Sequence, residues 1–201
     1  MKCSHAAAAA AAIAVALPSR FWIEAAAASD IEAGRQKAQV CVACHGPAGN
    51  STNPFMPSLA GQPAQFISTE LFQFREGNRK DPQMTPMAAK LSNADMNDLA
   101  AYFSAQRPEP TTHKTDPANA AAAPKLAQQF FCVQCHGPAL FGQQHIPRLA
   151  GQQFEYLKTQ LRSFKAQTRS DLDGNMTSAA QALTDNDIDV LVDYISGLGT
   201  P

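Results

Sequence analysis

The sequence has little charge and no excess of either sign. Lysine, arginine, aspartate and glutamate make up 16% of its 201 residues, and the formal net charge is −1. Residues 29–106 carry six basic against seven acidic side chains, and residues 107–201 carry eight against nine. Nucleic-acid binding requires a basic face that neutralises phosphates. We therefore expect no nucleic-acid partner.

The sequence also lacks an apolar run long enough to cross a bilayer, which takes about 20 residues. The apolar run at residues 6–17 follows the basic Lys2 and precedes small residues at 25–28. These are the three parts of a secretory signal peptide. We predict export, with residues 1–28 cleaved off near Ala28. The alternative is a retained N-terminal membrane anchor.

Cysteine is scarce and, apart from Cys3, is confined to two motifs, Cys41-Val-Ala-Cys-His45 and Cys132-Val-Gln-Cys-His136. A thioredoxin-like dithiol requires an α/β fold, and the sequence has no alternating strand pattern. A zinc site requires four ligands, but the other candidates, His113 and His145, do not correspond between the two copies. A structural disulfide leaves the matched histidines of the motifs unexplained.

Covalent attachment of a c-type haem uses every defined residue of the motif. The two cysteines add to the haem vinyl groups as thioethers, and the histidine binds the iron from one face. We therefore predict two covalently bound haems with their irons. The residues that hold them are Cys41, Cys44, His45, Cys132, Cys135 and His136.

The duplication extends over most of the chain. The segment Pro57-Ser-Leu-Ala-Gly-Gln62 parallels Pro147-Arg-Leu-Ala-Gly-Gln152, and other matches keep an offset of 90 to 92 residues. An ordered series of matches indicates a tandem repeat of small domains. Closely spaced prolines between the copies predict an extended linker. The predicted divisions are a signal peptide at 1–28, an N-terminal domain at 29–106, a linker at 107–120 and a C-terminal domain at 121–201.

Each copy has the apolar spacing of short helices. Residues 33–44 and 125–135 each read as one helix that ends in the cysteine motif. Ser92 and Thr184 precede an aspartate by three residues, which predicts capped last helices. About 80 residues with three or four short helices are marginal on burial alone. We predict an all-α fold of two tandem domains, each wrapped round a covalently bound haem.

The sixth iron position decides between electron exchange and small-molecule chemistry, and a thioether there suits electron exchange. The second copy has a single methionine, Met176. In the first copy Met84 matches it, since each lies eight residues before the predicted cap of the last helix. We predict both as iron ligands; the alternative is core filler. We do not expect the other methionines of the first copy to bind iron. Met56 lies too close to His45, and Met87 and Met96 match residues of the second copy that are not methionine.

Over residues 30–199, the two haem motifs, the P-x-LAGQ segments and the matched methionine segments resemble the dihaem class I cytochromes c of the cytochrome c4 family. The resemblance implies two cytochrome c domains related by a pseudo-twofold axis, with histidine and methionine on both irons. It implies a periplasmic role carrying electrons toward terminal oxidases, often in loose association with the membrane.

The resemblance also implies a role for two prolines, for which the alternative is a simple turn. The carbonyls of Pro57 and Pro147 are expected to accept hydrogen bonds from the Nδ1–H groups of the two motif histidines, which fixes the rings. Arg79 and Arg169 correspond between the copies and are candidates for pairing with haem propionates; the alternative is a solvated surface position.

The leading functional hypothesis is a periplasmic electron-transfer protein rather than an enzyme. Its two haems would relay single electrons between redox protein partners, such as a membrane reductase or oxidase, with no small-molecule substrate. One alternative is the electron-accepting subunit of a periplasmic dehydrogenase, for example a flavoprotein oxidising sulfide. Another is a dihaem peroxidase-type enzyme or the catalytic cytochrome of a sulfur-oxidising system. The second copy is one residue shorter between His136 and Pro147, so we expect the haems to differ in exposure.

Overall fold

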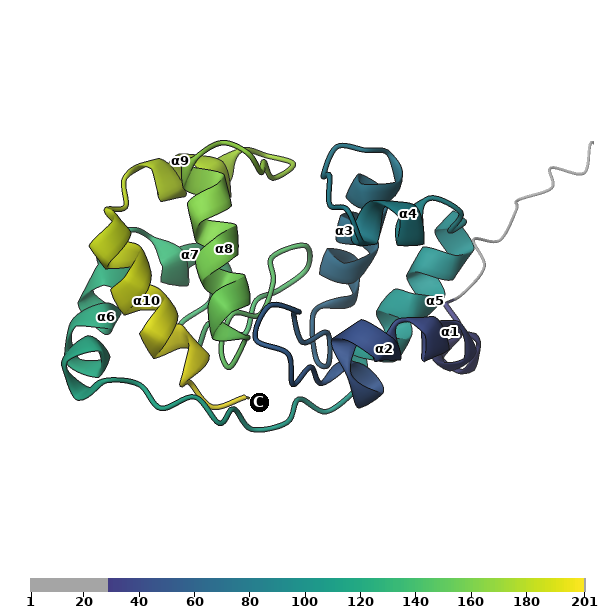
Figure 1. Ribbon diagram of the computed structural model, residues 1–201, viewed down its shortest axis with the longest axis horizontal. Coiled ribbons are helices and arrows are strands. Elements are labelled where there is room, and N and C mark those ends of the chain that lie inside the picture. Colours follow the sequence, from purple (N-terminus) through teal and green to yellow (C-terminus); the bar gives the residue numbers. More distant parts are fainter. Residues whose placement is uncertain (1–28, 201) are drawn as a thin grey trace, which may run out of the picture.

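The computed structural model describes residues 29–200, which form two helical lobes lying side by side (Figure 1). The first lobe contains α1 (Ile31–Lys37), the 3-10 turn η1 (Ala38–Val40), α2 (Val42–His45), the 3-10 turn η2 (Pro47–Gly49), α3 (Ala64–Arg75), α4 (Met84–Ala88) and α5 (Asn93–Ser104). The second contains α6 (Pro117–Gln129), α7 (Cys132–His136), α8 (Phe154–Lys165), α9 (Asn175–Gln181) and α10 (Asp185–Ser196).

The all-α fold predicted from the sequence is confirmed. Extended pairing in the described part of the chain is a single isolated bridge between Gln143 and Ile146. The predicted signal peptide at 1–28 lies outside the described residues. Among residues 29–200, no helix has the length and apolar character needed to cross a membrane.

The last helix of each lobe begins at the predicted cap. Ser92 Oγ accepts a hydrogen bond of 3.1 Å from the N–H of Asp95, whose carboxylate accepts one of 2.9 Å from the N–H of Ser92. Thr184 and Asp187 form the same reciprocal pair at the start of α10. Each box satisfies two backbone donors that the first helical turn leaves free.

The prediction of one unbroken helix leading into each cysteine motif is wrong. In the first lobe the 3-10 turn η1 separates α1 from α2. In the second lobe Phe131 has a φ of 60°, in the left-handed region, and ends the run between α6 and α7. Apolar spacing continues through both breaks, so it does not reveal them. The breaks set the direction in which the motif leaves the preceding helix.

Each lobe has its own apolar core beside the segments that carry the motif. In the first lobe α1 and α3 pack on α5, and in the second α6 and α8 pack on α10. The first core consists of Ala38, Ile67, Leu99, Ala100 and Phe103. The second consists of Ala127, Leu140, Ala150, Leu157, Leu183, Ile188, Leu191, Val192 and Ile195.

The predicted linker at 107–120 is extended over residues 107–116, after which α6 begins. It is fixed at both ends. Asn50 of the first lobe donates to the carbonyl of Arg107 at 3.1 Å. Asp193 of α10 accepts from the N–H of Asp116 at 2.9 Å and lies 2.7 Å from His113 Nε2. The connection is therefore docked along the lower edge of both lobes in Figure 1.

Candidate functional site

The two cysteine motifs occupy equivalent short helices, α2 and α7. Cys44 and Cys135 are exposed, Cys41 and Cys132 are half-buried, and all four thiols are free. Burial raises the pKa of the Cys41 and Cys132 thiols. The motifs thus present two pairs of unbridged cysteines, as thioether attachment requires. Among residues 29–200 no three or more histidine, cysteine, aspartate or glutamate side chains gather into a group that could hold a metal ion by themselves.

Each motif histidine is buried and held by one proline carbonyl. The Nδ1 atom of His45 lies 2.9 Å from the carbonyl oxygen of Pro57, and that of His136 lies 2.9 Å from the carbonyl oxygen of Pro147. A carbonyl only accepts, so Nδ1 carries the proton and Nε2 keeps its lone pair. Burial lowers the pKa of both histidines, which favours the neutral ring that binds metals.

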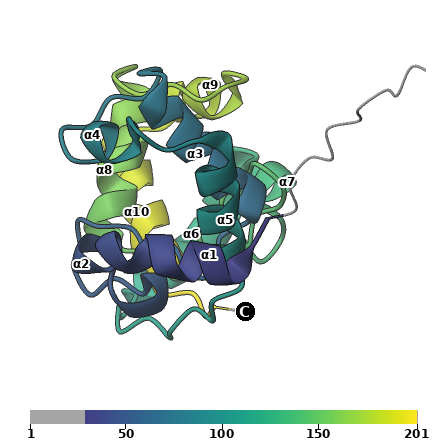
Figure 2. The same ribbon diagram turned by 90° about the vertical axis from the view of Figure 1, so that its right-hand side faces the viewer.

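The predicted methionine ligands lie at the starts of equivalent helices. Met84 begins α4, and its N–H donates to Asp81 Oδ1 at 2.8 Å. Met176 lies in the first turn of α9, and its N–H donates to Asp171 Oδ2 at 2.9 Å. In both views α4 lies above α2 and α9 above α7 (Figures 1 and 2). In each lobe, the helix that ends in the motif histidine and the helix that begins near the methionine therefore lie at different heights in these views.

The other methionines occupy different environments. Met96 is buried at 3% exposure in α5, while Met87 is 50% exposed on the short helix that Met84 begins. Met56 is half-buried in the loop directly before Pro57. Unlike Met84, which has Met176 as its counterpart near the start of a helix, none of these three matches a methionine of the other lobe.

Arg79 and Arg169 meet in one cluster between the lobes. Arg79 forms an ion pair with Glu70 of its own lobe and donates to Gln160 of the other at 3.0 Å. Arg169 reaches back to Glu70 at 3.3 Å. The guanidiniums lie 4.5 Å over the rings of Phe74 and Phe164. The two arginines are thus not solvated surface residues.

This cluster holds two cations against one carboxylate, and the buried Nε of Arg169 has no hydrogen-bond partner among the described residues. Burial and the neighbouring Arg79 lower the pKa of Arg169. An unmatched buried donor beside a surplus positive charge fits an additional anion. The carboxylate groups of a haem would satisfy both needs.

Arg148, which was not among the predicted site residues, is only 1% exposed. Its guanidinium donates to the carbonyl of Ala60 in the other lobe at 2.9 Å and to that of Ala150, while its buried Nε has no hydrogen-bond partner within residues 29–200. Burial lowers its pKa to about 10, so it stays charged at neutral pH. One sequence signal was available, because Ser58 occupies the matching position in an otherwise similar segment.

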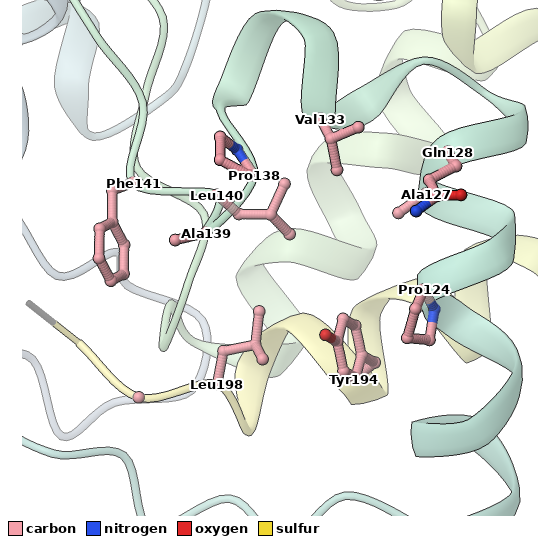
Figure 3. Close-up of a pocket in the computed structure, with 11 residues that line it drawn as sticks. Pro124, Ala127, Gln128, Val133, Pro138, Ala139, Leu140, Phe141, Tyr194 and Leu198 are labelled. Atoms are coloured by element: carbon pink, nitrogen blue, oxygen red, sulfur yellow. The ribbon is translucent and has the colours of Figure 1, made fainter.

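A pocket of about 250 Å³ lies on the second lobe (Figure 3). Its lining includes Pro124, Val133, Leu140, Tyr194 and Leu198. None of the motif cysteines, the histidines or the methionines contributes to it. Its walls are mainly apolar, and because Val133 belongs to the second cysteine motif, the pocket adjoins that motif.

Comparison with known proteins agrees with this geometry. The family model described as Cytochrome c matches residues 31–106 and 120–199. Cytochrome c4 of Thiocapsa roseopersicina is 39% identical over 181 residues, covering 84% of this chain and 93% of that protein. The thiosulfate dehydrogenase electron acceptor of Thiomonas intermedia is 34% identical, covering 90% and 87%. The crystal structure of reduced recombinant cytochrome c4 from Pseudomonas stutzeri superposes with a TM-score of 0.79 at 36% identity, over 85% of this chain and 100% of that one.

Proposed function

Because the chain belongs to the cytochrome c4 family of dihaem cytochromes c, we propose that it is a non-catalytic periplasmic electron carrier in which each haem iron has a methionine ligand. Two covalent c-type haems are held at the motifs through Cys41, Cys44, Cys132 and Cys135. When bound, they supply one-electron iron chemistry. The domains are proposed at 29–106 and 121–201, joined by the linker at 107–120.

The matched geometry of the two lobes carries this proposal. His45 and His136 are buried, share the same proline contact and keep Nε2 free for iron. We propose Met84 and Met176 as the opposite ligands, because each lies at the start of an equivalent helix whose backbone is fixed by an aspartate. An iron held by both a histidine and a methionine would be suited to electron exchange rather than to substrate binding. Arg79 and Arg169 are proposed to neutralise the propionates.

The test is the spectrum of the oxidised holoprotein at the red edge, where a methionine-to-iron charge-transfer band is expected. Met84→Ala and Met176→Ala should each remove about half of its amplitude, because each lobe contributes one such bond. Met87→Ala is the matched control, since Met87 lies on the same helix as Met84 but is half exposed. Loss of the band in Met87→Ala would contradict the ligand assignment. High-spin iron in the unmodified protein at neutral pH would contradict the carrier function.

The relative from Thiomonas intermedia, named for accepting electrons from thiosulfate dehydrogenase, favours a second candidate for the electron donor. We propose that the electron donor is a periplasmic dehydrogenase that oxidises a sulfur compound. The name of this relative favours thiosulfate as that compound, rather than the sulfide suggested in the sequence analysis. Stopped-flow reduction of the oxidised protein by a thiosulfate dehydrogenase plus thiosulfate tests this. Reduction no faster than by thiosulfate alone would exclude it. Turnover of hydrogen peroxide would instead support the peroxidase alternative.

Export and cleavage near Ala28 are proposed from the sequence. The mass of the mature dihaem protein isolated from the periplasm measures both. A chain that begins at Ser29 supports the proposal, and a full-length chain in the membrane fraction supports the retained anchor. Release of a processed chain from membranes by salt would indicate peripheral association.

A further inference from the structure

Two buried glutamines cross between the lobes at matching positions of the duplication. Gln62 and Gln152 end the two P-x-LAGQ segments and are 2% and 4% exposed. Gln62 accepts from the N–H of Arg148 at 2.9 Å and donates to its carbonyl at 2.9 Å. Gln152 accepts from the N–H of Ser58 at 2.7 Å and donates to its carbonyl at 2.9 Å. The amide oxygen and the amide nitrogen of each glutamine therefore both bind the backbone of one residue in the other lobe.

The residues bound in this way directly follow the prolines that hold the histidines. The carbonyl of Pro57 and the N–H of Ser58 belong to one planar peptide group. Its oxygen accepts from His45 at 2.9 Å, and its N–H donates to Gln152 in the other lobe at 2.7 Å. A single rigid group thus lies between the histidine of one lobe and the glutamine of the other.

The second lobe repeats the arrangement in the opposite direction. The peptide joining Pro147 and Arg148 accepts from His136 at 2.9 Å and donates to Gln62 at 2.9 Å. The two connections cross the interface reciprocally. Each histidine is two hydrogen bonds from a side chain of the other lobe.

Hydrogen bonds in series polarise one another. When the peptide N–H donates to a glutamine oxygen, electron density rises on the carbonyl oxygen of the same peptide, which becomes a better acceptor for the histidine Nδ1–H. A stronger bond there makes the imidazole a stronger donor to its metal. Stronger donation favours the more positive, oxidised iron. The glutamine also fixes the peptide plane and hence the direction of the ring.

We propose that Gln62 and Gln152 are positioning residues for the axial histidine of the opposite lobe, Gln152 acting on His45 and Gln62 on His136. This rests on the proposed function only in that both histidines bind haem iron. The reduction potential of each haem then depends on contact with the other lobe. If the glutamines only held the lobes together, a change in either one would not act specifically on the haem of the opposite lobe.

The experiment uses oxidised dihaem protein and two variants, Gln152→Leu and Gln62→Leu. The hyperfine-shifted proton resonances of each axial histidine are assigned, and the two potentials are resolved by redox titration. Gln152→Leu should move the His45 resonances and raise the potential of the first-lobe haem, leaving the second unchanged. Gln62→Leu should do the reverse. Equal shifts at both haems, a shift confined to the variant's own lobe, or no shift would overturn the proposal.

Gln153→Leu is the matched control. The side chain of Gln153 also donates across the interface, to the carbonyl of Ser51, but forms no hydrogen bond with either proline peptide among the described residues, so both histidine spectra should stay unchanged. Should a leucine variant fail to assemble, Gln152→Glu keeps a stronger acceptor at the same place. It should move the His45 resonances opposite to the direction expected for leucine, and a shift at His136 instead would overturn the proposal. The charge-transfer band separately reports methionine ligation, so failure of the proposed function is distinguishable.

Discussion

The crossing of α1 and α5 gives a prediction whose sign depends on two opposing effects. At Gly34, in the middle of α1, a Cβ would lie 2.1 Å from the carbonyl oxygen of Asp98 and 2.8 Å from the Cβ of Tyr102. Ordinary contact begins at 3.4 Å, so the oxygen is 1.3 Å too close. The obstacle is backbone, which cannot rotate aside. Gly34→Ala therefore requires the two helices to separate.

Helix propensity acts in the other direction. Replacing glycine by alanine inside a helix stabilises it by about 1 kcal/mol. Overpacking a close contact costs about 1–3 kcal/mol, and more where the backbone must move. Separation would also stretch the bonds from Lys37 and from the N–H of Asp30 to the Asp98 carboxylate, now 2.6 and 2.8 Å. We expect the clash to dominate, with a net loss of about 2 kcal/mol in the free energy of unfolding.

Guanidinium chloride unfolding of the oxidised holoprotein, followed by far-ultraviolet circular dichroism, measures this loss as a lower midpoint. Gly199→Ala is the control, because a Cβ there meets nothing within 4 Å. A Gly34→Ala protein as stable as the unmodified one, or more stable, would refute the packing argument. A gain near 1 kcal/mol would mean that propensity alone decides.

Three further predictions concern other contacts. Thr184→Ala removes the cap of α10 and should lower the free energy of unfolding by about 1 kcal/mol, with Thr184→Ser restoring it in thermal unfolding. Glu70→Gln leaves Arg79 and Arg169 without their shared carboxylate and should cost roughly 3 kcal/mol, while an unchanged unfolding midpoint would count against the cluster. Burial alone would raise the pKa of Asp193, but bonds from Asn119, the N–H of Asp116 and His113 lower it below its ordinary 3.8. Amide protection of the linker should therefore persist above about pH 4 and disappear as pH falls through the lower folded-state value, whereas Asp193→Asn should weaken it at neutral pH.

Local signals made much of this fold predictable. The capping boxes at Ser92 and Thr184 and the helical class depend on residues near in sequence, and the structure confirms them. The break at Phe131 was missed because a left-handed backbone at a non-glycine residue leaves no mark on apolar spacing. It depends on how the motif helix packs against the rest of its lobe.

The interface was less predictable for a related reason. The repeat identified Gln62 and Gln152 as corresponding residues, but correspondence does not say which lobe each one contacts. Arg79 and Arg169 were recognised as a pair, while Glu70 between them was not, since its counterpart is Gln160. Contacts between the copies need three-dimensional information that a comparison of the copies lacks.

The crossed glutamine contacts have the form of an isologous interface, in which one patch meets its own counterpart. In a dimer of identical chains every substitution at such an interface appears twice, so a buried charge introduced near the axis faces a second copy of itself. Covalent fusion removes this restriction, and a docked linker keeps the halves at high effective concentration. The chain can therefore have arginine at position 148 where the first copy has Ser58, and Glu70 where the second copy has Gln160. The matching contacts hold the two lobes together, and the positions at which the copies differ give the two lobes different electrostatic surroundings.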